Sequence, residues 1–124
     1  MPNLDEPEPP AIELSAVLHA LSDPTRLAVV RQIEADGERL CGAMAVDVAK
    51  STLSQHLRVL REAGITRTRC CGNQRWVSLR RDDLEQLFPG LLDVVLSAAA
   101  RMEAVARLEV STRAEAPVRM EVSH

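Results

Sequence analysis

The stretch KSTLSQHLRVLREAG, residues 50–64, combines hydroxyl, amide and basic side chains with the periodicity of a helix. Leu53, Leu57 and Leu60 recur at helical spacing and predict one buried face, while Gly64 predicts the end of the helix. Hydroxyls and free backbone N–H groups at a helix N-terminus can bind phosphate, and amide and guanidinium groups can pair with base edges. The open side of this helix therefore has the chemistry needed to lie against a polyanion.

The candidate nucleic-acid contacts come from this helix and from the segment that follows it. Gln55 can pair with adenine in the major groove, and Arg58 can reach guanine or phosphate. Ser51 also has an ordinary structural explanation as the N-cap of the helix, and His56 as part of its polar face. The full set of candidates is Lys50, Ser51, Thr52, Ser54, Gln55, His56, Arg58, Arg67, Arg69, Asn73, Gln74 and Arg75.

Charge is distributed unevenly along the 124-residue chain, whose net charge is −3. From Lys50 to Arg81 there are eight Lys or Arg residues and one acidic residue, Glu62, so this segment carries +7 and the remainder −10. Such asymmetry indicates a localised anion-binding surface. The alternative is a basic face that is merely solvated.

Local signals predict the helices that precede this segment. Residues 12–21 are amphipathic, and a second helix begins at Pro24 with Asp23 as its N-cap and ends at Gly37. A short helix is expected over residues 40–46. The buried stripe of the second helix is expected to consist of Leu27, Val30 and Ile33.

After the basic helix the pattern changes to that of strands. ITRTRC, residues 65–70, and RWVSLR, residues 75–80, alternate polar and apolar side chains, and CGNQ between them contains turn residues. The sequence therefore predicts an antiparallel hairpin that carries several of the candidate contacts.

Two further helices are expected beyond the hairpin. Asp82 and Glu85 have the spacing of a capping box for the first of them, and Pro89-Gly90 ends it. A long apolar helix then follows over residues 91–108.

Composition and the two ends of the chain set the domain organisation. With 46% hydrophobic residues, the chain can form one core. No apolar run is long enough to span a membrane, and the N-terminus lacks a signal-peptide pattern, so we expect a cytoplasmic protein. We expect a disordered, acidic, Pro-rich arm over residues 1–10, one domain over residues 11–109, and a flexible charged tail over residues 110–124. Arg-x-Glu recurs at intervals of six near that tail, a pattern that chance explains.

The motifs ALSDPTRLAVVRQI and STLSQHLRVLREAGI, followed by a basic hairpin and a terminal helix, resemble the ArsR/SmtB family of bacterial repressors. The resemblance covers about residues 12–108. It implies a mainly α fold with a small β-hairpin wing, a winged helix-turn-helix. It also implies a homodimer that binds a palindromic DNA operator, usually together with an inducer or corepressor.

The dimer would be held by the first and last helices. A helix as apolar as the one over residues 91–108 is hard to bury in a small monomer, although it could fold onto its own core. The residues expected at the interface are Leu14, Leu18, Leu91, Leu92, Val95, Ala99 and Met102.

Any sensor site departs from the family pattern. Members often use a Cys-x-Cys pair before the turn or His and acidic ligands on the last helix; here Cys41 stands alone, and the last helix lacks histidine. The remaining metal candidates are Cys41, Cys70, Cys71 and His19, for nickel, zinc or a soft metal or metalloid. Neighbouring residues of a strand point to opposite faces, which argues against one ion shared by Cys70 and Cys71. Thiol oxidation and the absence of any ligand stay open.

Two other classes of protein are alternatives to a transcriptional regulator. The sequence has no P-loop, G-x-S-x-G, H-E-x-x-H or dinucleotide fingerprint, so we expect no enzyme. The alternative to a DNA-binding regulator is a winged-helix interaction module or co-regulator that works with a partner protein and has no sensor site of its own.

Overall fold

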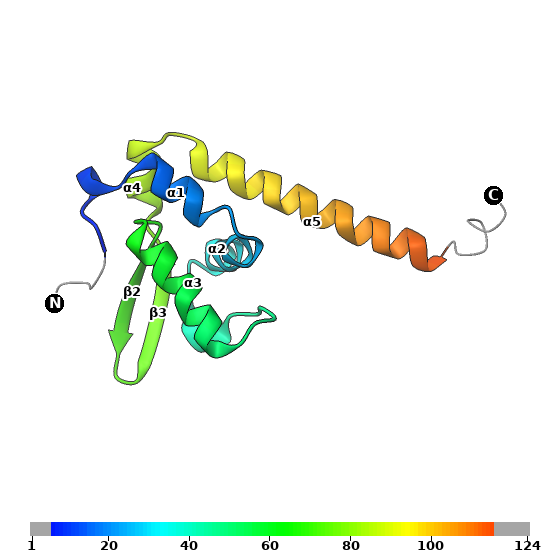
Figure 1. The fold of residues 1–124 in the computed structure, drawn as a ribbon, viewed down its shortest axis with the longest axis horizontal. Coiled ribbons are helices and arrows are strands. Elements are labelled where there is room, and N and C mark those ends of the chain that lie inside the picture. Colours follow the sequence, from blue (N-terminus) through cyan, green and yellow to red (C-terminus); the bar gives the residue numbers. More distant parts are fainter. Residues whose placement is uncertain (1–5, 116–124) are drawn as a thin grey trace. The chain divides into compact units, whose positions relative to one another are not determined.

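The computed structural model describes residues 6–115, with the side chains of residues 6–110. Two compact units divide at Leu92: Met1–Leu92 and Asp93–His124. The elements in chain order are η1 (Pro9–Ala11), α1 (Leu14–Ala20), α2 (Pro24–Asp36), β1 (Glu38–Leu40), η2 (Cys41–Ala43), α3 (Lys50–Glu62), β2 (Thr66–Cys71), β3 (Gln74–Leu79), α4 (Arg81–Leu87) and α5 (Leu91–Glu115) (Figure 1).

Helix α2 has the caps that its sequence predicts. The Asp23 carboxylate accepts hydrogen bonds from the backbone N–H groups of Thr25, at 2.8 Å, and Arg26, at 3.1 Å. Gly37 ends the helix at a φ of 84°, a conformation that favours glycine. The buried residues are Val29, Val30 and Ile33, whereas the predicted Leu27 is only half-buried. The core of the first unit forms around this helix.

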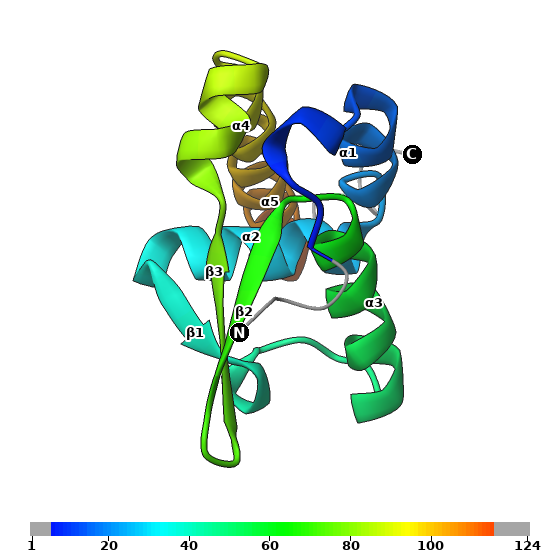
Figure 2. The same ribbon diagram turned by 90° about the vertical axis from the view of Figure 1, so that its left-hand side faces the viewer.

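The predicted hairpin is confirmed, and it belongs to a sheet of three antiparallel strands in the order β1-β3-β2 (Figure 2). Cys71 pairs with Gln74, so Gly72 and Asn73 form a two-residue turn. The third strand, β1, was not expected. It is three residues long and directly follows Gly37, so its only strong signal is the pairing with the distant β3.

The short helix expected over residues 40–46 is wrong. Only one 3-10 turn, η2, forms there; its C-cap, Met44, is already extended, and the chain bends at Asp47 and Val48 before α3. Gly42 favours helix poorly. The side chain of Gln32 fixes this segment, because its amide group both donates to the Ala45 carbonyl and accepts from the Ala45 N–H, each at 2.8 Å.

Two predicted caps are also wrong. Helix α3 begins at Lys50 with Ala49 as its N-cap, so Ser51 lies in the first turn and does not cap it. Helix α4 begins at Arg81 after Arg80, without a side-chain cap. Instead of closing a capping box, the Glu85 carboxylate accepts a hydrogen bond from the Gly90 N–H at 3.2 Å. Both helices therefore depend on tertiary packing more than on local caps.

The part of the expected N-terminal arm that the structure describes, residues 6–10, is attached to the hairpin. The Glu6 side chain is 5% exposed and accepts a hydrogen bond from the Thr68 N–H at 2.8 Å. The Pro7 carbonyl accepts one from Arg80 Nη1 at 2.7 Å. This segment thus provides a hydrogen-bond acceptor for one outward N–H group of the edge strand β2, that of Thr68. Residues 1–5 lie outside the described residues.

Helix α5 extends past its predicted end near Leu108 to Glu115, and residues 116–124 of the expected tail lie outside the described residues. Within the described residues, no helix is both long and apolar enough to cross a membrane. The buried apolar side chains are all aliphatic. Those of the first unit are Ile12, Val17, Ala20, Leu21, Val29, Val30, Ile33, Leu57, Leu60, Ala63, Ile65, Val77, Leu84 and Leu92, and Leu96 is buried in the second.

Candidate nucleic-acid interface

Helix α3 presents one polar, exposed face. Leu57 and Leu60 are 8% and 0% exposed and hold the opposite side of the helix in the core. Six residues of the outer side are exposed, and one of them, Arg58, also donates a hydrogen bond to Glu62. We call this surface the recognition face; it consists of Lys50, Ser51, Thr52, Ser54, Gln55 and Arg58.

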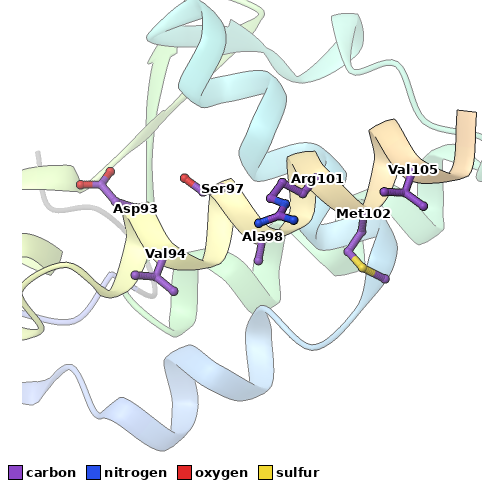
Figure 3. Close-up of a pocket in the computed structure, with 7 residues that line it drawn as sticks. All are labelled: Asp93, Val94, Ser97, Ala98, Arg101, Met102 and Val105. Atoms are coloured by element: carbon purple, nitrogen blue, oxygen red, sulfur yellow. The ribbon is translucent and has the colours of Figure 1, made fainter. Parts of the chain in front are cut away.

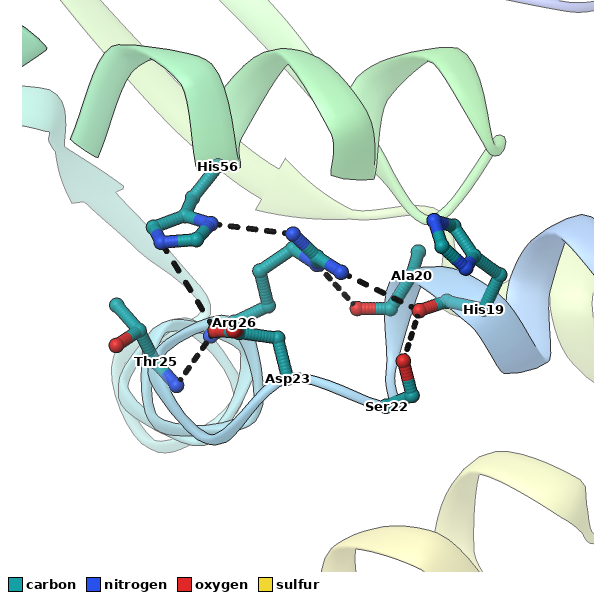
Figure 4. A network of polar contacts seen from close by, with 7 residues as sticks. All are labelled: His19, Ala20, Ser22, Asp23, Thr25, Arg26 and His56. Carbon is teal, nitrogen blue, oxygen red and sulfur yellow. Dashed lines mark hydrogen bonds and ion pairs between the residues drawn. The ribbon is translucent and has the colours of Figure 1, made fainter. Parts of the chain in front are cut away.

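His56, predicted as part of that face, instead points toward α2 (Figure 4). Its Nδ1 atom lies 3.2 Å from Nη1 of Arg26, and its Nε2 atom lies 3.9 Å from the Asp23 carboxylate. Because a guanidinium only donates, a hydrogen bond from Arg26 requires Nδ1 as its acceptor, and Nε2 is the ring nitrogen on the side of Asp23. His56 therefore connects the recognition helix to the start of α2.

Arg26 extends this connection to α1. Its Nε donates to the Ala20 carbonyl at 2.6 Å, and Nη2 donates to the His19 carbonyl at 3.3 Å (Figure 4). Burial raises the pKa of Asp23, but the hydrogen bond from the Arg26 N–H, the attraction of His56 and the Thr25 N–H outweigh it, so the pKa is lowered. One polar network thus joins three helices and fixes the orientation of α3.

The register of the hairpin separates its cations onto two faces. Arg69 lies opposite Trp76, and since side chains alternate, Arg67 shares that face. Arg75 and Thr68 lie on the other face and line a cavity beside α3. Only Arg75 among these arginines is therefore on the same side of the sheet as the recognition helix.

The face that carries Arg67 and Arg69 is largely neutralised. Arg69 donates two hydrogen bonds to Glu38, at 3.0 and 3.2 Å, and its guanidinium lies 5.8 Å from the centroid of the Trp76 ring. Hydrogen bonding to Glu38 raises the pKa of Arg69. Arg67 lies 3.7 Å from Glu6 and 3.6 Å from Asp83.

The charge separation of the sequence is consequently only partly preserved in the fold. Arg80 is 4% exposed and binds Asp83 and Pro7, Arg81 binds Glu34 at 2.6 Å, and Arg58 binds Glu62 at 2.8 Å. Among the side chains of residues 6–110, Lys50 and Arg75 have no ion-pair partner. The count of charges along residues 50–81 did not predict this neutralisation, because most of the acidic partners lie outside that segment.

The tip of the hairpin carries the remaining candidates. Asn73 and Gln74 are exposed at the turn, beyond the part of β3 that pairs with β1. Gly72 has a φ of 63° with no atom near its missing Cβ, so the tip is narrow and open. These amides are free to donate to an approaching phosphate or base edge.

The thiols do not form a metal site of the familiar kind. Cys70 and Cys71 are exposed, and their adjacent positions place them on opposite faces of β2. Cys41 is half-buried, and burial raises its pKa, against the opposing effects of Arg75 and Arg61. His19 contributes its carbonyl to the helix-joining network. No three His, Cys, Asp or Glu side chains converge among those that the structure describes, residues 6–110.

The residues expected at a dimer interface differ in exposure. Leu14, Leu18 and Met102 are exposed, and Leu91, Val95 and Ala99 are half-buried. Leu92 is 4% exposed and therefore belongs to the core of its own chain. On α5 a shallow hollow runs along one helical face, with Val94, Met102 and Val105 beside Asp93, Ser97, Ala98 and Arg101 (Figure 3). Val94, Val105, Leu108 and Val110 are exposed apolar residues that sequence reasoning did not assign to the interface.

Comparisons with known proteins agree with this geometry. Residues 21–69, which contain α2 and α3, match a helix-turn-helix domain. The chain is 39% identical over 82 residues, 64% of its length, to the uncharacterised HTH-type transcriptional regulator YceK of Bacillus subtilis and covers 82% of that protein. It is 37% identical over 83 residues, 65% of its length, to the biofilm growth-associated repressor of Agrobacterium fabrum and covers 70% of it.

A crystal structure of an ArsR family transcriptional regulator superimposes with a TM-score of 0.56 and 26% identity, over 64% of this chain and 89% of the other. These relatives are regulators of transcription and not enzymes. The chain belongs to the ArsR family of winged helix-turn-helix, DNA-binding transcriptional regulators.

Proposed function

We propose that this regulator is a repressor that binds a palindromic operator as a homodimer. The observation that carries the proposal is the recognition face, a solvent-facing row of hydroxyl, amide and basic groups on α3. It is fixed from behind by Leu57, Leu60 and the network of His56, Arg26 and Asp23. A rigidly oriented polar helix of this kind suits the major groove of DNA. The Agrobacterium relative, which is named a repressor, supports the direction of control.

Within the recognition face, Gln55 and Arg58 are the proposed readers of bases. Both are exposed, and both follow the first turn of α3, whose residues would contact phosphate. Arg58 would exchange its ion pair with Glu62 for guanine or a phosphate. Lys50 and the hydroxyls of Ser51, Thr52 and Ser54 would bind the backbone and set the register.

The hairpin would contact the adjacent backbone or minor groove. Arg75, Asn73 and Gln74 are exposed and need no rearrangement to do so. Arg67 and Arg69 can contact DNA only if its phosphates replace the carboxylates that now bind these two side chains.

Dimerisation is proposed from the exposed apolar residues of α1 and α5. Leu14, Leu18, Met102 and Val105 are each between 46% and 72% exposed, unusually high for large apolar side chains on two amphipathic helices. A second copy would cover such residues and present two α3 helices to half-sites about 34 Å apart.

The test is selection of bound duplexes from a random DNA library, followed by titration with the selected site. Replacing both Gln55 and Arg58 with alanine should weaken binding markedly, since each bidentate base contact contributes about 1–3 kcal/mol. Affinity should also fall steeply with salt, because bound Lys and Arg release counterions. Gln86→Ala, an exposed change on α4, is the control and should bind as the native protein does.

Selection of no common duplex sequence would contradict the proposal. So would a Gln55→Ala/Arg58→Ala protein that binds the selected site at native strength. Either result would favour the alternative, a winged-helix module that works through a partner protein.

A further inference from the structure

A cavity of about 580 Å³ lies beside the recognition helix, within the first unit. It is bordered by residues 44–48, by α3, and by the face of the hairpin that carries Thr68 and Arg75. Ligand pockets for small molecules commonly have volumes of about 300–1,000 Å³. Its size therefore suits a small molecule.

Residues 44–48 give this cavity an apolar wall. Met44, Val46 and Val48 all line the cavity, whereas Ala45 and Asp47 between them are exposed. Leu53 and Leu57 of α3 complete the apolar lining. The two hydrogen bonds from Gln32 to Ala45 hold the wall in place.

The other lining side chains are mainly cationic. Lys50, Arg58, Arg61 and Arg75 all border the cavity, and none of the described side chains that line it is acidic. Arg61 and Arg75 also lie near the half-buried Cys41 thiol, whose pKa they lower against the stronger effect of burial. Guanidinium groups from α3 and from β3 thus border the same cavity, and guanidinium is the side-chain group that best pairs with a carboxylate.

DNA phosphate accounts for the cations but not for the apolar wall. A phosphodiester is polar on every side and gains nothing from Met44, Val46 or Val48. A molecule with an anionic head and a hydrocarbon body uses both halves of the lining, because the head pairs with arginine and the body removes apolar surface from water.

We propose that this cavity binds a small amphipathic organic anion, and that the bound anion excludes DNA from the recognition face. Four of the proposed DNA contacts also line the cavity: Lys50, Ser54, Arg58 and Arg75. These side chains cannot bind the anion and DNA at the same time. This inference rests on the proposed function, since it makes the same surface the point of regulation.

The first arm of the test measures binding to the full-length protein by calorimetry, without DNA. The probes are octanoate and 2-naphthoate, with octanamide as the neutral analogue and inorganic phosphate as the anion without an apolar body. Both carboxylates should bind, and octanamide and phosphate should bind at least tenfold more weakly. Val46→Glu should abolish carboxylate binding, because it places a like charge in the apolar wall.

Gln86→Glu is the control, since it adds the same charge on an exposed face of α4 outside the cavity. Met44→Glu is the second cavity variant, used if Val46→Glu fails to melt cooperatively. In the second arm, a carboxylate at ten times its dissociation constant should weaken binding of the selected duplex about tenfold. The same addition should leave DNA binding by Val46→Glu unchanged.

Binding of neither carboxylate, or equal binding by native protein and by both cavity variants, would overturn the inference and leave the proposed function intact. Carboxylate binding that leaves duplex affinity unchanged would overturn the exclusion of DNA. A protein that binds carboxylate but selects no duplex would instead refute the proposed function, which the DNA-free first arm keeps separate.

Discussion

At the residue scale, ion pairs determine which arginines of the hairpin can reach a polyanion. Arg69 is held by two hydrogen bonds to Glu38 and lies against Trp76, whereas Arg75 has no ion pair with any side chain of residues 6–110. An exposed pair contributes little to stability, yet it must be broken before the cation can bind phosphate. Identical side chains on opposite faces of one hairpin should therefore contribute unequally to DNA binding.

Arg75→Ala should lower affinity for the selected duplex and reduce the slope of log affinity against log salt by about one contact. Arg69→Ala should have a smaller effect on both quantities, because Glu38 already neutralises this guanidinium on the distal face. Fluorescence anisotropy at several salt concentrations measures both. Equal losses for the two variants would mean that DNA contacts both faces of the hairpin.

At the element scale, the Asp23 cap connects local helix formation with the orientation of α3. Asp23→Ala should reduce the free energy of unfolding by about 0.5–2 kcal/mol, as for other N-caps. The pKa of Asp23 is lower in the folded state, so the unfolded state binds more protons as the pH falls. The stabilisation is thus complete above the ordinary carboxyl pKa and is lost as the pH drops through the folded value.

Urea unfolding at neutral pH and at a series of acidic pH values measures this contribution. The native protein should lose more stability than Asp23→Ala over the acidic range, so the two curves converge. Curves that stay parallel would show that other carboxylates carry the acid sensitivity.

The turn after α3 gives a second prediction at this scale. Gly64 has a φ of 87°, and a Cβ there would lie 2.6 Å from Cγ1 of Ile12, a buried β-branched side chain. Gly64→Ala should therefore destabilise the protein through both backbone strain and overpacking, each about 1–3 kcal/mol.

Gly72→Ala is the matched control, because Gly72 also has a positive φ, 63°, but no atom lies within 4 Å of the position that a Cβ would take. Thermal unfolding should show a larger loss for Gly64→Ala than for Gly72→Ala. Adding Ile12→Ala should recover part of the difference if the clash is its cause. Equal losses would assign the whole effect to the backbone conformation.

The elements that the sequence predicts correctly have signals in adjacent residues. Asp23, Pro24 and Gly37 bound α2 through local caps, and alternation around Gly72 defines the hairpin. The short strand β1 and the segment after η2 depend on pairing with β3 and on Gln32, which lie far along the chain. The pattern of neighbouring residues cannot predict partners that are distant in sequence.

The candidate site follows the same rule. The outer face of α3 was predicted because the leucine spacing alone determines which side is buried. The inward orientation of His56 and the ion pairs of Arg67 and Arg69 were not, because each depends on a residue from another element. Spacing along one helix thus defined the face, and tertiary partners decided which of its members are available.

At the scale of the whole molecule, the proposed dimer depends on one face of α5. Val94, Ala98, Met102 and Val105 follow helical spacing along the shallow hollow, and Val94, Met102 and Val105 are 67%, 72% and 50% exposed, which is high for apolar side chains. Arg107 forms an ion pair with Glu103 at 3.8 Å, and helical geometry places this pair on the opposite side of α5. The helix therefore has an apolar face that a partner copy can cover and a charged face that it need not cover.

Met102→Glu combined with Val105→Glu should convert the protein to a monomer, because burying two carboxylates in an apolar interface is strongly unfavourable. Arg107→Glu changes the net charge by the same amount from the charged face and should leave the dimer intact. Sedimentation velocity across a range of protein concentrations distinguishes the two. The monomeric variant should keep its helical circular dichroism yet bind a selected palindrome far more weakly, since each half-site must then be bound independently. A Met102→Glu/Val105→Glu protein that still sediments as a dimer would place the interface elsewhere, and α1, through Leu14 and Leu18, would be the next surface to change.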